Sequence, residues 1–345
     1  MMHFFRSPRS TFFRLLLFLI PAAAAAVPET GYVNLRTDLM RVPKSMVKSA
    51  PEKAIEHSEA RLTVSIFMNV LSGTRAQVKL QNSFETREGG VSFAVTPDIH
   101  VPGKTARIDF SALYLMPDGG VFNAPGDSGF NNAAGISSRR ILRVLRPSAV
   151  GLFAMPGEGA IVPLLYVYTQ YPVPNLLPKY TELDCRLLTV DSEELKRFSG
   201  NPLVEPLLRD YVLDKIAQEK TAFSRTLKIN RGRAVYSDTV PREDPVRNRK
   251  VPVGITIRYS LLSGSVFRLE VTETRFIGER RSSDPDYHGK VPVFETFSYE
   301  GYLAAQKGKW IMPARVVSRH AGNRSFFEQK ETDHPKEKIL LIRMR

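Results

Sequence analysis

The stretch that most constrains the fold is residues 90–115, GVSFAVTPDIHVPGKTARIDFSALYL, in which apolar and polar residues alternate. Val91, Phe93 and Val95 are separated by small or polar residues, which is the period of a β-strand with one buried face. The alternation resumes after the Pro-Gly dipeptide at 102–103, a sequence that favours a chain reversal. Residues 90–115 are therefore predicted to form a β-hairpin.

The hairpin pattern returns late in the chain, at residues 253–276. Other features also recur in the same order. They are the strand-like stretches 33–49 and 182–198, the turns 72–78 and 230–236, the hairpin segments 107–110 and 268–271, and the glycine-centred stretches 157–167 and 306–316. A repeated order of features over such a length predicts an internal duplication. We place the modules at residues 27–172 and 173–345, joined by the proline-rich stretch 171–178.

The composition and periodicities predict a mostly β fold of the α+β class, with two tandem β-rich modules. Each module is expected to contain a small antiparallel sheet with one or two helices. Helical spacing of apolar residues, or capping residues, predict helices at 47–60, 192–198 and 206–222. Polar, glycine-rich or charged composition predicts loops at 117–138, 238–251 and 278–290.

The first 26 residues have the features of a secretory signal peptide. Three arginines precede a short apolar run at 15–20, and a proline and five alanines follow it. The predicted cleavage lies near Ala26–Val27. The formal net charge of +14 would fall to +11, since 14 minus the three arginines is 11. The mature protein is therefore expected to be exported to the periplasm or the outer membrane, and to remain basic.

The side chains offer little sign of catalytic chemistry. The single cysteine, Cys185, has apolar neighbours and is predicted to be a small core residue. The histidines are widely spaced, so no metal site and no cofactor are predicted. Asp284, Asp286 and His288 share a loop and can ligate a cation, but a solvated turn is the simpler interpretation. Trp310 is predicted to be a core residue.

Basic residues gather at three places: Arg139, Arg140, Arg143 and Arg146; Arg242, Arg247, Arg249 and Lys250; and the pair Arg280 and Arg281. The first and third groups are the candidates for a partner-binding surface. Such groups can meet an anionic polymer or lipid surface. Charges on strand edges also prevent unwanted strand pairing, and this alternative stays open. Nucleic acid is not expected as a partner, because no long basic block is present.

Short motifs in both halves resemble the C-terminal β-domain of bacterial secretins, the outer-membrane gates of secretion systems and type IV pili. In the first half they are SGTRA at 72–76, VTPDI at 95–99 and Gly159. In the second half they are GRA at 232–234, PVF at 292–294 and GKW at 308–310. The resemblance implies two divergent copies of a secretin-like β-module without the N-terminal ring domains that secretins carry.

Three functions follow as hypotheses. The resemblance and the signal peptide favour a non-enzymatic structural or assembly protein of the cell envelope, which acts with other envelope proteins or by self-assembly. A periplasmic protein that binds a polymer or carbohydrate is the second hypothesis. The third is a hydrolase with an unrecognised site, because two carboxylates can meet from any part of a chain.

Overall fold

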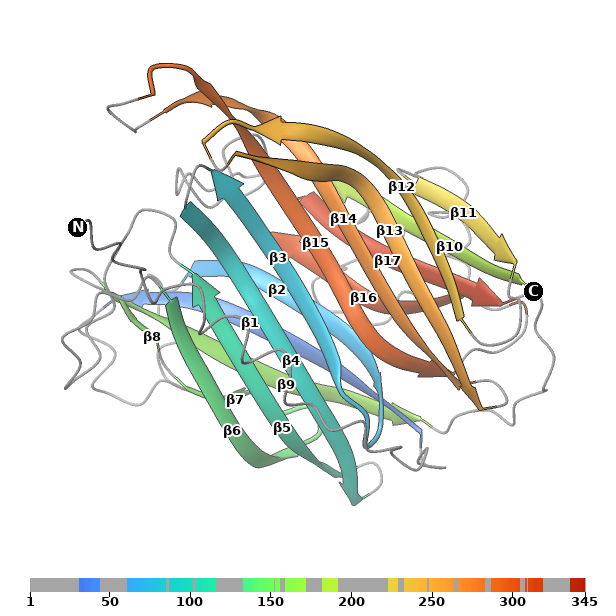
Figure 1. Ribbon diagram of the computed structural model, residues 1–345. Helices are drawn as coiled ribbons and strands as arrows, with labels where there is room; N and C mark the ends of the chain where they lie inside the picture. Colours follow the sequence, from blue (N-terminus) through green and yellow to red (C-terminus); the bar gives the residue numbers. More distant parts are fainter. Residues whose placement is uncertain are drawn as a thin grey trace, which may run out of the picture.

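A computed structural model describes most of the strands of this chain and places them in two stacked antiparallel sheets (Figure 1). The described residues are 31–43, 61–84, 87–101, 104–115, 133–151, 153–155, 159–171, 182–191, 223–228, 233–246, 248–263, 266–282, 287–304, 308, 310–318 and 336–344. No helix occurs among them. The predicted signal peptide, the linker after residue 171 and all three predicted helices lie outside these residues.

Sheet A has nine strands. In spatial order they are β11 (Phe223–Lys228), β10 (Glu182–Asp191), β17 (Lys336–Met344), β16 (Trp310–Ser318), β2 (Arg61–Leu71), β1 (Tyr32–Pro43), β9 (Gly159–Tyr171) and β7 (Ser148–Ala149), with β8 (Phe153–Met155) also pairing with β9. Sheet B has eight strands. In spatial order they are β12 (Arg233–Asp244), β13 (Arg249–Ser263), β14 (Val266–Arg281), β15 (Lys290–Ala304), β3 (Ala76–Phe84), β4 (Arg87–Val101), β5 (Thr105–Leu115) and β6 (Ala133–Arg143).

The predicted hairpin at 90–115 is confirmed as β4 and β5, which pair from Gly90↔Leu115 to Val101↔Thr105. The late hairpin is β13 and β14. Three predicted loops are partly wrong, because β6 begins at Ala133, β12 and β13 extend into 238–251, and β14 runs to Arg281. In each case polar side chains alternate along a solvent-facing strand, so their composition resembles that of a loop.

The predicted fold class is wrong in two respects. The described part of the chain is almost wholly β rather than α+β, with no helix in either half. Neither half forms a separate small sheet, because β15 pairs with β3 in sheet B and β16 pairs with β2 in sheet A. Hydrophobic alternation predicts strands well, but it does not determine which strands become neighbours.

The order of strands is the same in both halves of the chain. Sheet B reads β12-β13-β14-β15 and then β3-β4-β5-β6, and sheet A reads β11-β10-β17-β16 and then β2-β1-β9 with β7 and β8. By position in sheet A, β9 of the first half is equivalent to β17 of the second half. The sequence comparison of 157–167 with 306–316 predicts that β9 is equivalent to β16, and this prediction is wrong. The boundary between residues 172 and 173 stays a prediction.

A pair of glycines fixes the correspondence between the halves residue by residue. Gly90 pairs with Gln81 and has φ 146°, and Gly254 pairs with Thr239 and has φ 135°. Few residues other than glycine adopt these values. If Gly90 and Gly254 are equivalent, then Ala76 of the first half corresponds to Ala234 of the second half. The sequence match of 72–78 with 230–236 predicts the same correspondence. The same correspondence matches Arg268 with Asp109, and not with Arg107 as the sequence match of 107–110 with 268–271 predicts.

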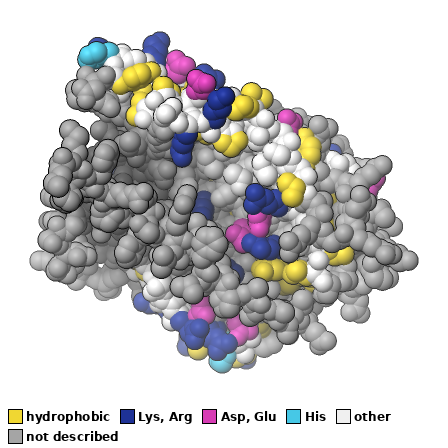
Figure 2. Space-filling view, viewed as in Figure 1, with side chains coloured by type: hydrophobic (Ala, Val, Ile, Leu, Met, Phe, Trp, Pro, Cys, Tyr) yellow, Lys and Arg dark blue, Asp and Glu magenta, His cyan; other side chains and the backbone are white. Residues whose placement is uncertain are grey.

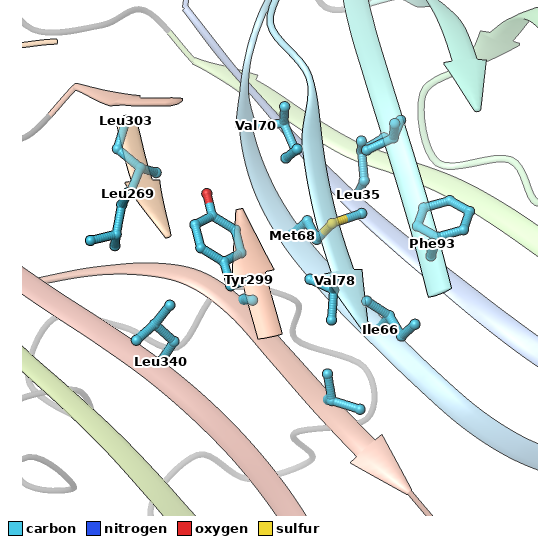
Figure 3. Close-up of a cluster of buried hydrophobic side chains, with 14 of the residues drawn as sticks. Leu35, Ile66, Met68, Val70, Val78, Phe93, Leu269, Tyr299, Leu303 and Leu340 are labelled. Atoms are coloured by element: carbon cyan, nitrogen blue, oxygen red, sulfur yellow. The ribbon is translucent and has the colours of Figure 1, made fainter. Parts of the chain in front are cut away.

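The core lies between the two sheets (Figure 3). Leu35, Ile66 and Met68 of sheet A face Val78 and Phe93 of sheet B in one cluster of buried side chains. Tyr32 of β1 joins the sheets by hydrogen bonds: its hydroxyl donates to the carbonyl of Ala304 at 2.5 Å and accepts from the Ala304 amide at 2.6 Å. This contact connects the first strand of the chain to the end of β15.

The two sheets differ on their outer faces, the faces that point away from the partner sheet. In sheet A, outward residues such as Phe67, Leu164 and Leu341 are buried, so its strands are buried on both faces. In sheet B, outward residues such as Thr272 and Arg258 are exposed. The outer face of sheet B is therefore solvent-exposed at positions of β13 and β14.

Candidate functional site: the outer face of sheet B

The arginines predicted as a binding surface do not come together. Arg139, Arg140 and Arg143 lie on β6, at one end of sheet B, and Arg146 follows that strand. Arg280 and Arg281 end β14, and the strands β15, β3, β4 and β5 separate β14 from β6. Five strand spacings of about 4.8 Å place the two groups on the order of 24 Å apart across the sheet.

Arg139 has a carboxylate partner on its own sheet. Its Nε and Nη2 donate to the two carboxylate oxygens of Asp109 at 2.5 and 2.8 Å, a bidentate pair across β5 and β6. The arginine holds the pKa of Asp109 below its ordinary value, first through these hydrogen bonds and then through its charge. Arg140 lies within 3.4 Å of the Ser138 hydroxyl. Arg139 is therefore paired with a carboxylate, whereas Arg140 contacts only the neutral Ser138 hydroxyl in these bonds.

A second surface, which the sequence analysis missed, covers the outer face of β12 to β15. Hydroxyl groups line two adjacent rows across these strands. One row contains Ser237, Thr256, Thr272 and Ser298, and the other contains Thr239, Thr274 and Thr296. We call this surface the hydroxyl face. Its signal in the sequence is the alternation of serine or threonine at 237–239, 272–274 and 296–298.

Neighbouring hydroxyls of this face lie close enough to share hydrogen bonds. Ser237 Oγ lies 3.2 Å from Thr256 Oγ1, and Thr274 Oγ1 lies 3.2 Å from Thr296 Oγ1. Each hydroxyl is both a donor and an acceptor, so it retains capacity for an external partner. Threonine also has high β-propensity, which explains why these strands tolerate a polar row.

Charged side chains border the hydroxyl face. Arg268 lies between two carboxylates, with Nη2 at 2.8 Å from Glu270 and 2.5 Å from Glu300, and Arg258 lies 3.7 Å from Glu270. Figure 2 shows, over the described part of this side of the molecule, white atoms of backbone and of uncharged polar side chains with hydrophobic side chains among them, and blue and magenta side chains beside them. The surface therefore combines neutral donors and acceptors with balanced charge.

The outer face of sheet A carries buried ion pairs instead of a surface site. Arg36 donates to Asp38 at 2.7 Å, and its guanidinium lies over the rings of Phe67 and Tyr166. Arg315 donates from Nε to Glu337 at 2.6 Å, and its guanidinium lies over the ring of Phe67, its neighbour across β16 and β2. Burial raises the pKa of Asp38, although Arg36 and the Ser65 hydroxyl oppose the shift.

The Arg315–Glu337 pair joins β16 to β17, whereas Arg36 and Asp38 lie on the same strand, β1. The side chains of Arg315, Glu337 and Asp38 are almost inaccessible. Arg315 and Glu337 are 0 % exposed, and Asp38 is 3 % exposed. Two carboxylates also hold Lys338 between the sheets, with Glu273 and Glu295 each at 2.7 Å from its Nζ. We assign all of these groups to the structure of the fold. The sequence signal for these buried ion pairs is a charged residue at every second position of a strand that is rich in apolar residues. The segment LRTDLM at 35–40 is an example.

Other sequence predictions have clear positions. Cys185 is buried in the core, and Trp310 is 7 % exposed with the guanidinium groups of Arg186 and Arg343 over its ring. Among the described residues no group of His, Cys, Asp and Glu can hold a metal ion. Asp284 and Asp286 lie outside those residues. In the same part of the chain no helix is long and apolar enough to cross a membrane.

Cys185 supplies a direct test of the core. Burial raises the pKa of its thiol to about 12, above the ordinary value of 9.0, and the nearby Asp184 contributes. We expect the folded protein not to react with a thiol reagent at pH 8 and the urea-unfolded protein to react at once, because only the thiolate is nucleophilic. As the pH rises, the thiol of the unfolded chain loses its proton at a lower pH than the thiol of the folded chain. The free energy of unfolding should therefore fall between pH 9 and 12 through the titration of Cys185. Fast labelling of the native protein would contradict this placement.

Comparisons with known proteins add no functional information. The chain matches no family model, and no curated protein matches it. A search of solved structures gives a chain of a Francisella PdpA-VgrG complex at a TM-score of 0.15 and 8% sequence identity, covering 90% of this chain and 53% of that chain. The chain therefore spans about half the length of that structure, and the similarity is too low to support the fold or a function.

Proposed function

We propose that this chain is a non-enzymatic protein of the cell envelope that binds an extended, hydroxyl-rich polymer, such as a polysaccharide, on the hydroxyl face. The signal-peptide-like N-terminus supports export to the periplasm or the outer membrane. The observation that carries the proposal is the pair of hydroxyl rows on β12 to β15. The hydroxyl groups recur at the regular spacing of the strands. This arrangement suits a polymer whose own hydrogen-bond donors and acceptors recur along its length.

The chemistry of the described residues also favours binding over catalysis. The buried carboxylates of Asp38 and Glu337 are engaged by arginine, Asp38 by Arg36 and Glu337 by Arg315. The Cys185 thiol is buried and protonated, so it is unsuited to nucleophilic attack. The exposed groups of the hydroxyl face are neutral donors and acceptors, which suit recognition of sugar hydroxyls.

Ring assembly of the secretin type, the other function expected from the sequence, would require strand edges that are free to pair. Among the described residues the outer strands of sheet B, β12 and β6, have one strand partner each, and both carry a charged inward residue, Asp238 on β12 and Arg140 on β6. Pairing at these edges would bury those charges. We therefore favour polymer binding over self-assembly.

The proposal is tested by retention of the purified mature protein on insoluble polysaccharides, with peptidoglycan sacculi and microcrystalline cellulose as separate probes. The variant T256V/T272V/T274V removes three outward hydroxyls and keeps the shape of each side chain. Each lost hydrogen bond is worth about 0.5–1.5 kcal/mol, so binding should weaken by roughly tenfold or more. The control T96V/S111A/S137A removes three outward hydroxyls from β4, β5 and β6 and should bind like the wild type.

Two outcomes would contradict this function. The first is a wild-type protein that no polysaccharide retains. The second is a T256V/T272V/T274V variant that is folded, monomeric by gel filtration and retained as well as the wild type.

A further inference from the structure

Apolar side chains are exposed at one corner of sheet B, where β4 ends, β5 begins and β6 ends. Val101 is 40 % exposed, Ile141 is 58 % exposed and Leu145 is 68 % exposed. Val101 of β4 and Arg143 of β6 both pair with Thr105 of β5. Ile141 lies two residues before Arg143, so both side chains lie on the same face of β6. The corner therefore combines exposed apolar side chains with arginine.

Backbone hydrogen bonds hold the segments of this corner together. The Lys104 amide donates to the Val101 carbonyl at 3.0 Å, and the Val144 amide donates to the Lys104 carbonyl at 2.9 Å. The Leu145 amide donates to the carbonyl of Val167 in sheet A at 2.7 Å. The positions of the exposed side chains are therefore set by the fold.

The cations of this corner exceed its carboxylates. Arg107 donates to Asp98 at 2.5 Å, and Arg139 is paired with Asp109. Three further exposed cations have no ion-pair partner in the described part of the chain: Lys104, Arg143 and Arg146. In Figure 2 dark blue side chains gather at the lower end of the molecule with magenta and yellow ones beside them, and Figure 1 places the ends of β4 and β6 there. We call the surface formed by the three apolar side chains and the three unpaired cations the basic corner.

The backbone at Leu145 is strained. Its φ is 64°, in the left-handed region that residues other than glycine, asparagine and aspartate rarely adopt. The side chain is more than half exposed, so little burial in the core offsets this strain. Strained residues of this kind cluster at functional sites, and here the strain presents an apolar side chain to the solvent beside unpaired cations.

We propose that the basic corner docks the protein on the surface of an anionic lipid membrane. Its apolar side chains enter the boundary between the headgroups and the acyl chains, and its cations contact the lipid phosphates. An acidic protein or polymer would account for the cations but not for the exposed apolar side chains among them. A lipid surface satisfies both, because it offers negative charge and apolar chains within one side-chain length. The basic corner shares no strand with the hydroxyl face, so this inference does not rest on polymer binding.

The test is flotation of the purified mature protein with vesicles made of equal parts of phosphatidylglycerol and phosphatidylcholine. Vesicles of phosphatidylcholine alone are the second probe. We expect binding to the anionic vesicles only, and weaker binding at high salt, because salt screens exposed charges. Each lysine or arginine beside an anionic leaflet strengthens binding by about fivefold, so the variant K104Q/R143Q/R146Q should bind roughly a hundredfold more weakly.

The matched control for the cations is R249Q/K250Q/R281Q. It removes three exposed cations from the opposite end of sheet B, where β13 begins and β14 ends. The control has the same net charge as K104Q/R143Q/R146Q and should bind the anionic vesicles like the wild type.

The apolar side chains are tested by I141S/L145S, with V235S/V240S on β12 as the matched control. Val235 and Val240 are 68 % and 70 % exposed, so the control removes two equally exposed apolar side chains from the other edge of the sheet. The variant I141S/L145S should bind the anionic vesicles roughly tenfold more weakly or less, because each buried methylene group contributes to membrane affinity. The control should bind like the wild type.

Leu145→Asn separates membrane binding from folding. Asparagine tolerates the left-handed conformation, so this variant should unfold at the same or a higher urea concentration than the wild type and still bind the anionic vesicles several-fold more weakly. A wild type that neither vesicle retains, or that both vesicles retain equally, would overturn the proposal. So would a folded I141S/L145S variant that binds like the wild type while K104Q/R143Q/R146Q does not, because the corner would then be a surface for acidic polymers and not for lipid.

Discussion

Replacing Glu337 with alanine is expected to destabilise the protein by about 3–5 kcal/mol, because removing one partner leaves the other charge buried without compensation. Glu337 accepts a hydrogen bond from Arg315 Nε at 2.6 Å, and both side chains are 0 % exposed. The two terminal nitrogens of Arg315 have no hydrogen-bond partner among the described residues. Urea unfolding followed by circular dichroism measures the effect.

The double variant R315M/E337L is the matched control for this prediction. Apolar side chains of similar size in place of a buried ion pair are often neutral or stabilising. We expect the double variant to recover most of the stability that Glu337→Ala loses, because β16, β17 and the Phe67 ring supply apolar neighbours. If the single and double variants lose the same free energy of unfolding, the cost arises from packing and not from the unpaired charge.

The variants Gly90→Ala and Gly254→Ala are expected to have the second-largest effect, and a similar one in both halves. Both glycines have φ values that other residues rarely adopt, and this strain alone costs about 1–3 kcal/mol. A Cβ at residue 90 would also overlap the carbonyl oxygen of Leu80, and one at residue 254 would overlap that of Asp238. Backbone atoms of a neighbouring strand cannot move aside without breaking the ladder.

Gly278 provides the control for the overlap. Its φ is 145°, close to the values of Gly90 and Gly254, but no atom lies within 4 Å of a Cβ built there. Gly278→Ala should therefore show the backbone strain alone and lose less stability than the other two variants. Thermal and urea unfolding of all three variants decide the matter. Equal losses at the three positions would show that crowding by the neighbouring strand contributes nothing.

Much of the β structure could be predicted from the alternation of residues. In the hairpin at 90–115 one face of each strand is apolar, and a strand with this period must place that face in a core. The match of Ala76 with Ala234 was also accessible, because the residues around both turns are similar. The loops predicted at 238–251 and 278–290 were partly wrong, because the exposed strands of sheet B that enter these ranges have polar compositions.

The candidate surfaces were less accessible from the sequence. A cluster of arginines is visible in the sequence, but the strand order that separates Arg280 from Arg139 is not. The hydroxyl face is assembled from four strands, so each strand shows only one or two of its hydroxyls. The inward direction of Asp238 and Arg140 becomes clear only when their partners, Ile255 and Ile108, are seen in the core.

The sequence by itself determined that the chain forms amphipathic strands, that their order repeats and that Cys185 belongs to a core. These properties depend on local periodicity and on the preferences of single residues. Only the tertiary structure decided that the halves share both sheets, and that sheet A is buried on both faces while β13 and β14 of sheet B are exposed on one. These properties depend on contacts between strands that are distant in the chain, and such contacts follow from the packing of the whole sandwich.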